Sequence, residues 1–230
     1  NAIDYCMDSA GIKGADLDLA AYTTIYEHPW EVKAKITPTF SIMDYHEYYT
    51  DRYYSKIFAG ESGIDYLRWL RDDEKFNHGN TGFDFSFLTD DVLECPEQIK
   101  KLWTMERRRK LASYLGLEDN RIRFLDHHTC HAYYSYFSGP YTGNRCAIVI
   151  LDGWGDGRNQ TVWIANGHHI QLIAESDQND IGHIYKMATL YLGMRPDEHE
   201  FKVMGLAPYS KQKYVDQVFN KIRQINKIDG

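Results

Sequence analysis

Two histidines four residues apart, His127 and His131, have the residue type and spacing to bind a metal ion. They begin a segment of helical composition, and helix positions i and i+4 project from one face, one turn apart. Two imidazole nitrogens so placed can reach one divalent ion at about 2 Å. Most pairs of this kind are ordinary surface or core histidines, so the pattern alone is weak. His128 is expected to turn away from the pair, and a carboxylate from elsewhere must complete a site.

A strand that runs into a carboxylate and three glycines is the second candidate. Residues 147–151 form a continuous apolar run, which is typical of a strand in a sheet covered on both faces. Glycines permit positive φ, so successive N–H groups can converge on phosphate oxygens. The alternative is a β-turn between two strands, which Asp-Gly and Gly-Asp pairs also favour. The residues alone leave both interpretations open for Asp152, Gly153, Trp154, Gly155, Asp156 and Gly157.

The segment 200–209 is the third candidate. Its glycine and proline predict a loop, yet it is apolar, which suggests a loop packed near a site. Lys202 could reach a phosphate or neutralise Glu200. Met204 and Leu206 are expected to lie in the core rather than to contact a ligand.

Length and composition narrow the class of protein. A chain of 230 residues can form one large domain or two modest lobes, each with its own core. The net charge of −7 argues against a nucleic-acid-binding face, and the basic run 107–110 is interpreted as a solvated helix face. No apolar stretch approaches the ~20 residues of a membrane span, and no signal peptide is recognisable. The four scattered cysteines favour reduced thiols in a cytoplasmic protein.

The elements that must position these residues follow from periodicity. A helix is predicted from the first residues to Gly11, then a strand at 17–23, and residues 24–95 read as an irregular insertion. A long helix should start at Pro96 and end near Gly116. Further elements are a strand at 122–125, a helix at 128–138, strands at 161–165 and 169–174 with a turn at Asn166-Gly167, and helices near 184–192 and 215–222.

Alternating strands and helices of this kind indicate an α/β domain. Because a helical pattern begins at Asn1, the chain is expected to be a fragment of a longer protein.

With the three candidate segments in this order, the sequence resembles the O-carbamoyltransferase family that includes the nodulation-factor and aminoglycoside-antibiotic enzymes. The likeness covers roughly residues 120–210; each motif is weak, but the set is specific. The matching residues are His127, His128, His131 and Ala132, then Leu151, Asp152, Gly153, Gly155 and Asp156, then Gly182, Tyr185, Thr189, Leu192 and Gly193, and finally Lys202 and residues 204–209.

The resemblance implies an actin/Hsp70/sugar-kinase-like (ribonuclease H-like) ATP-binding domain, incomplete at both ends. Residues 1–145 would form a partial first lobe, which contains the insertion and ends in the His-x-x-x-His helix. Residues 146–230 would begin the second lobe with its glycine-rich phosphate hairpin.

The resemblance also implies an activity. A separate C-terminal domain of the parent protein would make carbamoyl-adenylate from carbamoyl phosphate and ATP. The present domain would then pass the carbamoyl group to a hydroxyl of a small molecule or glycan. His127 and His131 would hold a divalent metal, Fe²⁺ first among the choices, and Mg²⁺ could accompany ATP. Asp152 would lie beside the metal as a catalytic group, with nucleotide contacts from Gly153, Trp154, Gly155, Asp156, Gly157 and Lys202.

Two parts of the family pattern are expected outside this chain. A first strand with its loop should precede Asn1, and the last metal carboxylate should follow Gly230, so the fragment alone is expected to be inactive.

Two other functions stay open. One is a tRNA threonylcarbamoyl-transfer protein, which the net charge disfavours. The other is a non-enzymatic, ATP-dependent module of the same fold.

Overall fold

The computed structural model of the protein describes residues 2–26, 28–61, 65–76, 82–178 and 181–225. The chain forms two compact units. One contains Asn1–Phe40 and Gly60–His131, and the other contains Ser41–Ala59 and Ala132–Gly230. Each unit combines helices with a small sheet, so the predicted mixed α/β class is confirmed. The assignment of two lobes that meet at residue 145 stays a prediction.

The first unit is built on two parallel strands and a long helix. Strand β1 (Ala20–Tyr22) pairs with β2 (Ile122–Phe124), and α7 (Pro96–Leu115) packs beside them through Ala112 and Leu115. Pro96 starts α7, and Gly116 ends it at φ 68°, as the sequence predicts. The other elements are α1 (Ala2–Ala10), α2 (Pro29–Lys35), α5 (Asp65–Asp72), α6 (Asp90–Leu93) and the 3₁₀ helices Gly14–Asp16, Glu74–Phe76 and Asp119–Arg121.

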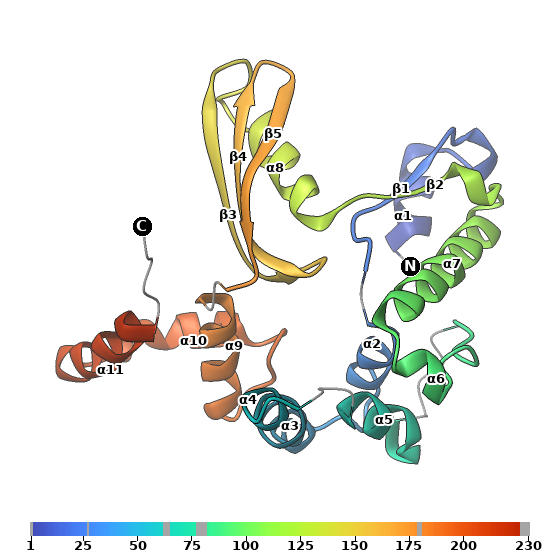
Figure 1. The fold of residues 1–230 in the computed structure, drawn as a ribbon. Helices are drawn as coiled ribbons and strands as arrows, with labels where there is room; N and C mark the ends of the chain where they lie inside the picture. The colour runs from blue at the N-terminus through green and yellow to red at the C-terminus, as the bar shows by residue number, and fades with distance from the viewer. Residues whose placement is uncertain (1, 27, 62–64, 77–81, 179–180, 226–230) are drawn as a thin grey trace. The chain divides into compact units, whose positions relative to one another are not determined.

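The second unit contains an antiparallel three-stranded sheet in the order β3 (Cys146–Gly155), β4 (Arg158–Asn166), β5 (His169–Ser176). Helix α8 (His127–Phe137) lies along one face of this sheet (Figure 1). The boundary between the units falls within α8, but the helix is continuous, and its Ala132 and Tyr136 share a core with Ile148 and Ile150 of β3.

The prediction that this sheet is covered on both faces is wrong for the described residues. Along β3, Ile148 and Ile150 are buried, whereas Val149 and Leu151 are 59% and 54% exposed. Neighbouring side chains of a strand point to opposite faces, so a helix packed on one face buries only every second residue.

The remaining elements of the second unit are helical. Helix α3 (Ile42–His46) continues into a π-helix, Glu47–Tyr54, and then into α4 (Ser55–Phe58). This segment packs on α9 (Ile181–Tyr191), where Lys186 lies 5.0 Å from the centre of the Tyr49 ring. The chain continues through α10 (Glu200–Leu206), the 3₁₀ helix Ala207–Tyr209 and α11 (Gln212–Ile225).

Two predictions of irregular structure are wrong. Residues 24–95 contain a series of short helices rather than an irregular insertion, and their tyrosines are ordered by packing; Tyr48 and Tyr49 are 4% and 5% exposed. Residues 200–206 form α10 instead of a loop, because Gly205 is tolerated within a helix and Pro208 follows its end. Met204 and Leu206 are 63% and 48% exposed, so their predicted place in the core is also wrong.

Both hairpin turns contain two residues. Gly155 pairs with Arg158, which leaves Asp156 and Gly157 as the first turn, at φ 52° and 86°. Positive φ at both positions is the geometry of a type I′ turn. Asn166 pairs with His169 in the second hairpin, so its turn lies one residue later than the sequence predicts.

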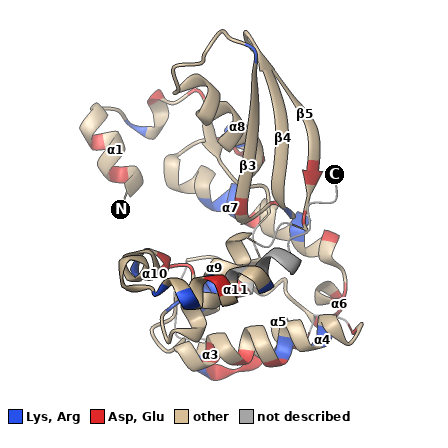
Figure 2. Ribbon diagram, turned by 90° about the vertical axis from the view of Figure 1, so that its left-hand side faces the viewer, with Lys and Arg blue, Asp and Glu red and all other residues tan. Residues whose placement is uncertain are grey.

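Basic and acidic residues are interspersed along the ribbon, and α5 carries both (Figure 2). The interpretation of residues 107–110 as a solvated face is wrong for Arg107, which is 1% exposed. Its guanidinium donates to the carbonyl oxygens of Thr24 and Ile25, and it lies 4.8 Å from the centre of the Phe124 ring. Across the described parts of the chain, no helix has the length and apolar character needed to cross a bilayer.

Candidate metal centre

The helix that carries the two histidines starts directly after β2 and is capped by its own sequence. The Asp126 carboxylate accepts hydrogen bonds from the Thr129 backbone N–H (2.7 Å) and from the Thr129 hydroxyl (2.8 Å). A carboxylate at this position satisfies an unpaired donor of the first turn and opposes the positive end of the helix dipole. Ala132, which is fully buried against the sheet, sets which face of α8 points inward.

His127 and His131 lie one above the other on α8. Their Nε2 atoms are 3.1 Å apart, and the ring centres are 4.6 Å apart at an interplanar angle of 81°. His127 is half-buried and His131 is exposed. His128 is fully buried, so it does not share the exposed face of the pair, as the sequence predicts.

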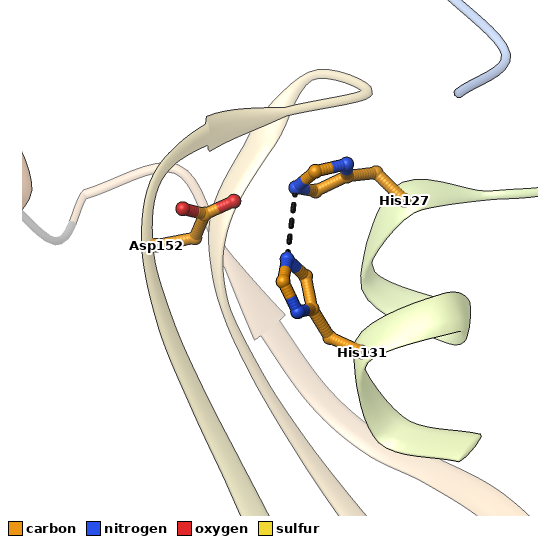
Figure 3. Close-up of side chains that lie close together, drawn as sticks. All are labelled: His127, His131 and Asp152. Carbon is orange, nitrogen blue, oxygen red and sulfur yellow. Dashed lines mark hydrogen bonds between the residues drawn. The ribbon is translucent and has the colours of Figure 1, made fainter. Parts of the chain in front are cut away.

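Asp152 lies near the end of β3, and its carboxylate points toward the two imidazole rings (Figure 3). The ligand atoms of His127, His131 and Asp152 all lie within 4.8 Å of one another. Oδ1 of Asp152 accepts a hydrogen bond of 2.7 Å from the Gly153 backbone N–H, which orients the carboxylate. The structure therefore brings together two imidazoles and one half-buried carboxylate.

The spacing of these atoms fits a divalent metal ion. The Nε2 separation of 3.1 Å is less than twice a metal–imidazole bond of about 2.1 Å, so both nitrogens can bind one ion. A carboxylate oxygen at the 4.8 Å limit would have to move inward by a few tenths of an ångström, or coordinate through a water. Two imidazoles and a carboxylate suit iron and zinc, and this set leaves coordination positions open for a substrate.

The predicted phosphate loop has a different local structure from the one expected. Residues 152–155 belong to β3, where a bulge interrupts the pairing between Leu151 and Gly155, and only Asp156 and Gly157 form a turn. Trp154 is 54% exposed, and its ring lies 5.9 Å from that of His183 on α9. A bulge next to a site re-aims side chains, and this one lies beside Asp152.

Lys202, the remaining predicted nucleotide contact, is exposed on α10. Its ammonium lies 5.7 Å from the centre of the Phe201 ring. The nucleotide-binding roles of Lys202 and of residues 153–157 stay predictions.

The sequence predicts that Asp152 lies beside the two histidines, and the structure places its ligand atom within 4.8 Å of theirs. The last metal carboxylate, expected beyond Gly230, stays a prediction. Sequence reasoning missed the capping role of Asp126, although an Asp immediately before a helical pattern is a recognised start signal.

Comparisons with known proteins agree with the motifs. The family model described as "Carbamoyltransferase N-terminus" matches residues 1–229. An uncharacterized protein of Synechocystis sp. is 32% identical over 110 residues, which is 47% of this chain and 17% of the relative. The nodulation protein NolNO of Sinorhizobium fredii is 32% identical over 105 residues, 44% of this chain and 15% of the relative. The nodulation protein NolO of Bradyrhizobium diazoefficiens is 28% identical over 102 residues, 44% of this chain and 18% of the relative.

Each match covers less than a fifth of the length of these relatives. The family model, in contrast, covers nearly the whole chain, and it confirms the resemblance found in the motifs at the level of the family. The chain therefore belongs to the carbamoyltransferase N-terminal family.

Proposed function

We propose that this chain is the carbamoyl-transferring part of an O-carbamoyltransferase, which moves a carbamoyl group from carbamoyl-adenylate to a hydroxyl of a small molecule or glycan. One observation carries the proposal: His127, His131 and Asp152, from two different elements, place their ligand atoms within 4.8 Å of one another. Membership of the carbamoyltransferase family supports the reaction class.

The proposed step is an acyl-type transfer. The acceptor oxygen forms a bond to the carbamoyl carbon, and the bond from that carbon to the phosphate oxygen of AMP breaks. The hydroxyl proton passes to a base, and AMP leaves with the electron pair of the broken bond. The products are the O-carbamoylated acceptor and AMP, so the step needs no other reactant.

In this proposal His127 and His131 hold a divalent ion, Fe²⁺ by preference, through Nε2. When bound, such an ion supplies Lewis-acid polarisation of a carbonyl or phosphate oxygen. Asp152 completes the ligand set or, with the ion held by the imidazoles, accepts the acceptor's proton. The Gly153 N–H that holds Asp152 Oδ1 keeps the carboxylate aimed at the imidazoles.

The donor side of the reaction is assigned to the second unit. We propose that the nucleotide phosphates, with Mg²⁺ when ATP is bound, meet residues 153–157 and Lys202. The antiparallel β3–β4–β5 sheet followed by α9 supports the start of one lobe of an actin/Hsp70-like fold. Carbamoyl phosphate and ATP would be used by a C-terminal adenylate-forming domain of the parent protein, which supplies carbamoyl-adenylate to this chain.

The test uses the full-length parent protein with carbamoyl phosphate, ATP, Fe²⁺ and a panel of hydroxyl-bearing sugars and aminoglycosides. The double variant His127→Ala/His131→Ala should lose bound iron, measured by atomic emission, and should lose transfer to the acceptor. It should still form carbamoyl-adenylate, because a separate domain makes it. His169→Ala, an exposed histidine on β5, is the matched control and should keep both properties.

Three results would contradict the proposal. A wild-type protein that transfers carbamoyl groups at full rate without metal would refute the site assignment. A requirement for threonine and tRNA would favour the threonylcarbamoyl-transfer function. ATP binding without any use of carbamoyl phosphate would favour a non-enzymatic module.

A further inference from the structure

The first turn of α9 lies directly against the backbone that carries Asp152. A Cβ atom at Gly182 would lie 2.6 Å from the Gly153 Cα, 3.0 Å from the Gly153 N and 3.1 Å from the Asp152 carbonyl oxygen. All three neighbours are main-chain atoms, which cannot rotate away as the end of a long side chain can. Any residue other than glycine at 182 must therefore move β3, α9 or both.

The backbone amide that Gly182 approaches is also the one that orients Asp152, the proposed third ligand. The Gly153 N–H donates the 2.7 Å hydrogen bond to Oδ1 of Asp152. A shift of this amide would re-aim the carboxylate, whose ligand atom lies within 4.8 Å of those of His127 and His131. Gly182 and the candidate metal centre are thus linked through a single amide group.

A second contact from the same turn reinforces the first. The ring of His183, the residue after Gly182, lies 5.9 Å from the ring of Trp154, at an interplanar angle of 42°. Two consecutive residues of α9 therefore contact the two residues that follow Asp152. This is the bulged stretch of β3, where the pairing register with β4 shifts.

We propose that Gly182 is a positioning residue for the metal centre: the close approach of α9, which only glycine allows, fixes the Gly153 amide and thereby aims Asp152 at the metal held by His127 and His131. The inference rests on the proposed function, because it takes Asp152 as a metal ligand. It adds that the first turn of α9, which contributes no ligand of its own to the cluster, determines the affinity of the site.

The test is a titration of the full-length protein with Co²⁺, whose visible absorption reports the number and geometry of its ligands. Gly182→Ala is compared with wild type and with Asp152→Ala. We expect Gly182→Ala to bind Co²⁺ about 10-fold or more weakly, the range seen when groups that orient metal ligands are changed. Its spectrum should resemble that of Asp152→Ala. A merely structural role would lower the unfolding midpoint and leave the Co²⁺ spectrum of the folded protein unchanged.

Gly205→Ala is the matched control, because a Cβ at that helical position meets no atom within 4 Å. It should keep the wild-type Co²⁺ affinity and spectrum. If Gly182→Ala does not fold, His183→Ala replaces it, since a truncation cannot clash. Loss of the ring contact with Trp154 should then weaken Co²⁺ binding, as expected for Gly182→Ala. Co²⁺ binding that is unchanged in His183→Ala would overturn the inference.

The results separate this inference from the proposed function. A wild-type protein that binds no Co²⁺, or whose binding does not depend on His127 and His131, overturns both. Binding that depends on both histidines and on Asp152, but is the same in Gly182→Ala, overturns only the positioning role. Binding that is unaffected by Asp152→Ala also overturns it, because Asp152 would then not be a ligand.

Discussion

His28 predicts a specific loss of stability in mild acid. It precedes α2, and both of its ring nitrogens are buried without a hydrogen-bond partner. Burial disfavours the imidazolium and lowers the pKa of His28 to about 4, although the nearby Glu31 carboxylate acts in the opposite direction. Because histidine in the unfolded chain has a pKa of about 6.5, the unfolded state binds more protons between these values. Stability is therefore lost as the pH falls from 6.5 toward 4.

The size of the effect follows from the two pKa values. A pKa difference of one between the folded and unfolded states is worth about 1.36 kcal/mol, so the difference between 6.5 and 4 amounts to about 3 kcal/mol. About 2 kcal/mol of this free energy of unfolding is lost by pH 5. The assay is urea unfolding of wild type and His28→Gln at pH 7.5, 6.0 and 5.0. The free energy of unfolding should fall by about 2 kcal/mol less in His28→Gln than in wild type over this range.

Other groups also titrate in this range, so the difference between the two proteins, rather than either curve alone, carries the prediction. His169→Gln changes an exposed histidine on β5 and should follow the wild-type pH dependence. Parallel curves for wild type and His28→Gln would refute the reasoning, since they would show that His28 takes up no extra proton on unfolding.

Two further predictions concern packing. Ala132→Leu should lower the free energy of unfolding by about 1–3 kcal/mol in urea unfolding, because Ala132 is fully buried where α8 packs on the sheet. The variant should also weaken Co²⁺ binding. A variant as stable as wild type would show that this interface has room for a larger side chain. Arg107→Met should lower the free energy of unfolding by about 2 kcal/mol, because it removes charge-assisted hydrogen bonds to the carbonyls of Thr24 and Ile25. An equal or higher urea midpoint in the variant would show that the cost of burying the Arg107 charge is larger than the stability those hydrogen bonds provide.

Local signals in the sequence were sufficient to predict the features that depend only on residues close together in the chain. Helix α7 begins at Pro96 and ends before Gly116, because proline suits a first helical turn and glycine accepts the left-handed conformation at a helix end. The i, i+4 spacing of His127 and His131 likewise determined that the two imidazoles share a face once the helix forms. The family was also readable, because several weak motifs occur together in one order.

Contacts between distant segments could not be read in this way. The apolar run 147–151 favours a strand covered on both faces, yet Val149 and Leu151 are exposed, because α8 packs on the face that carries Ile148 and Ile150. Arg107 belongs to a basic run that reads as solvated, yet carbonyls more than eighty positions away and aromatic rings bury it. Propensity and periodicity describe a residue's own segment, and these outcomes depend on which other segment packs against it.

The candidate site shows the same division. The sequence alone determined the residue types, the helical pairing of His127 with His131, and a carboxylate at the end of an apolar strand. Only the tertiary structure decided that Asp152 reaches the imidazoles, because that depends on how α8 packs on β3 through Ala132 and on how closely α9 approaches at Gly182. Both are contacts between surfaces far apart in the chain, and short-range patterns carry no information about them.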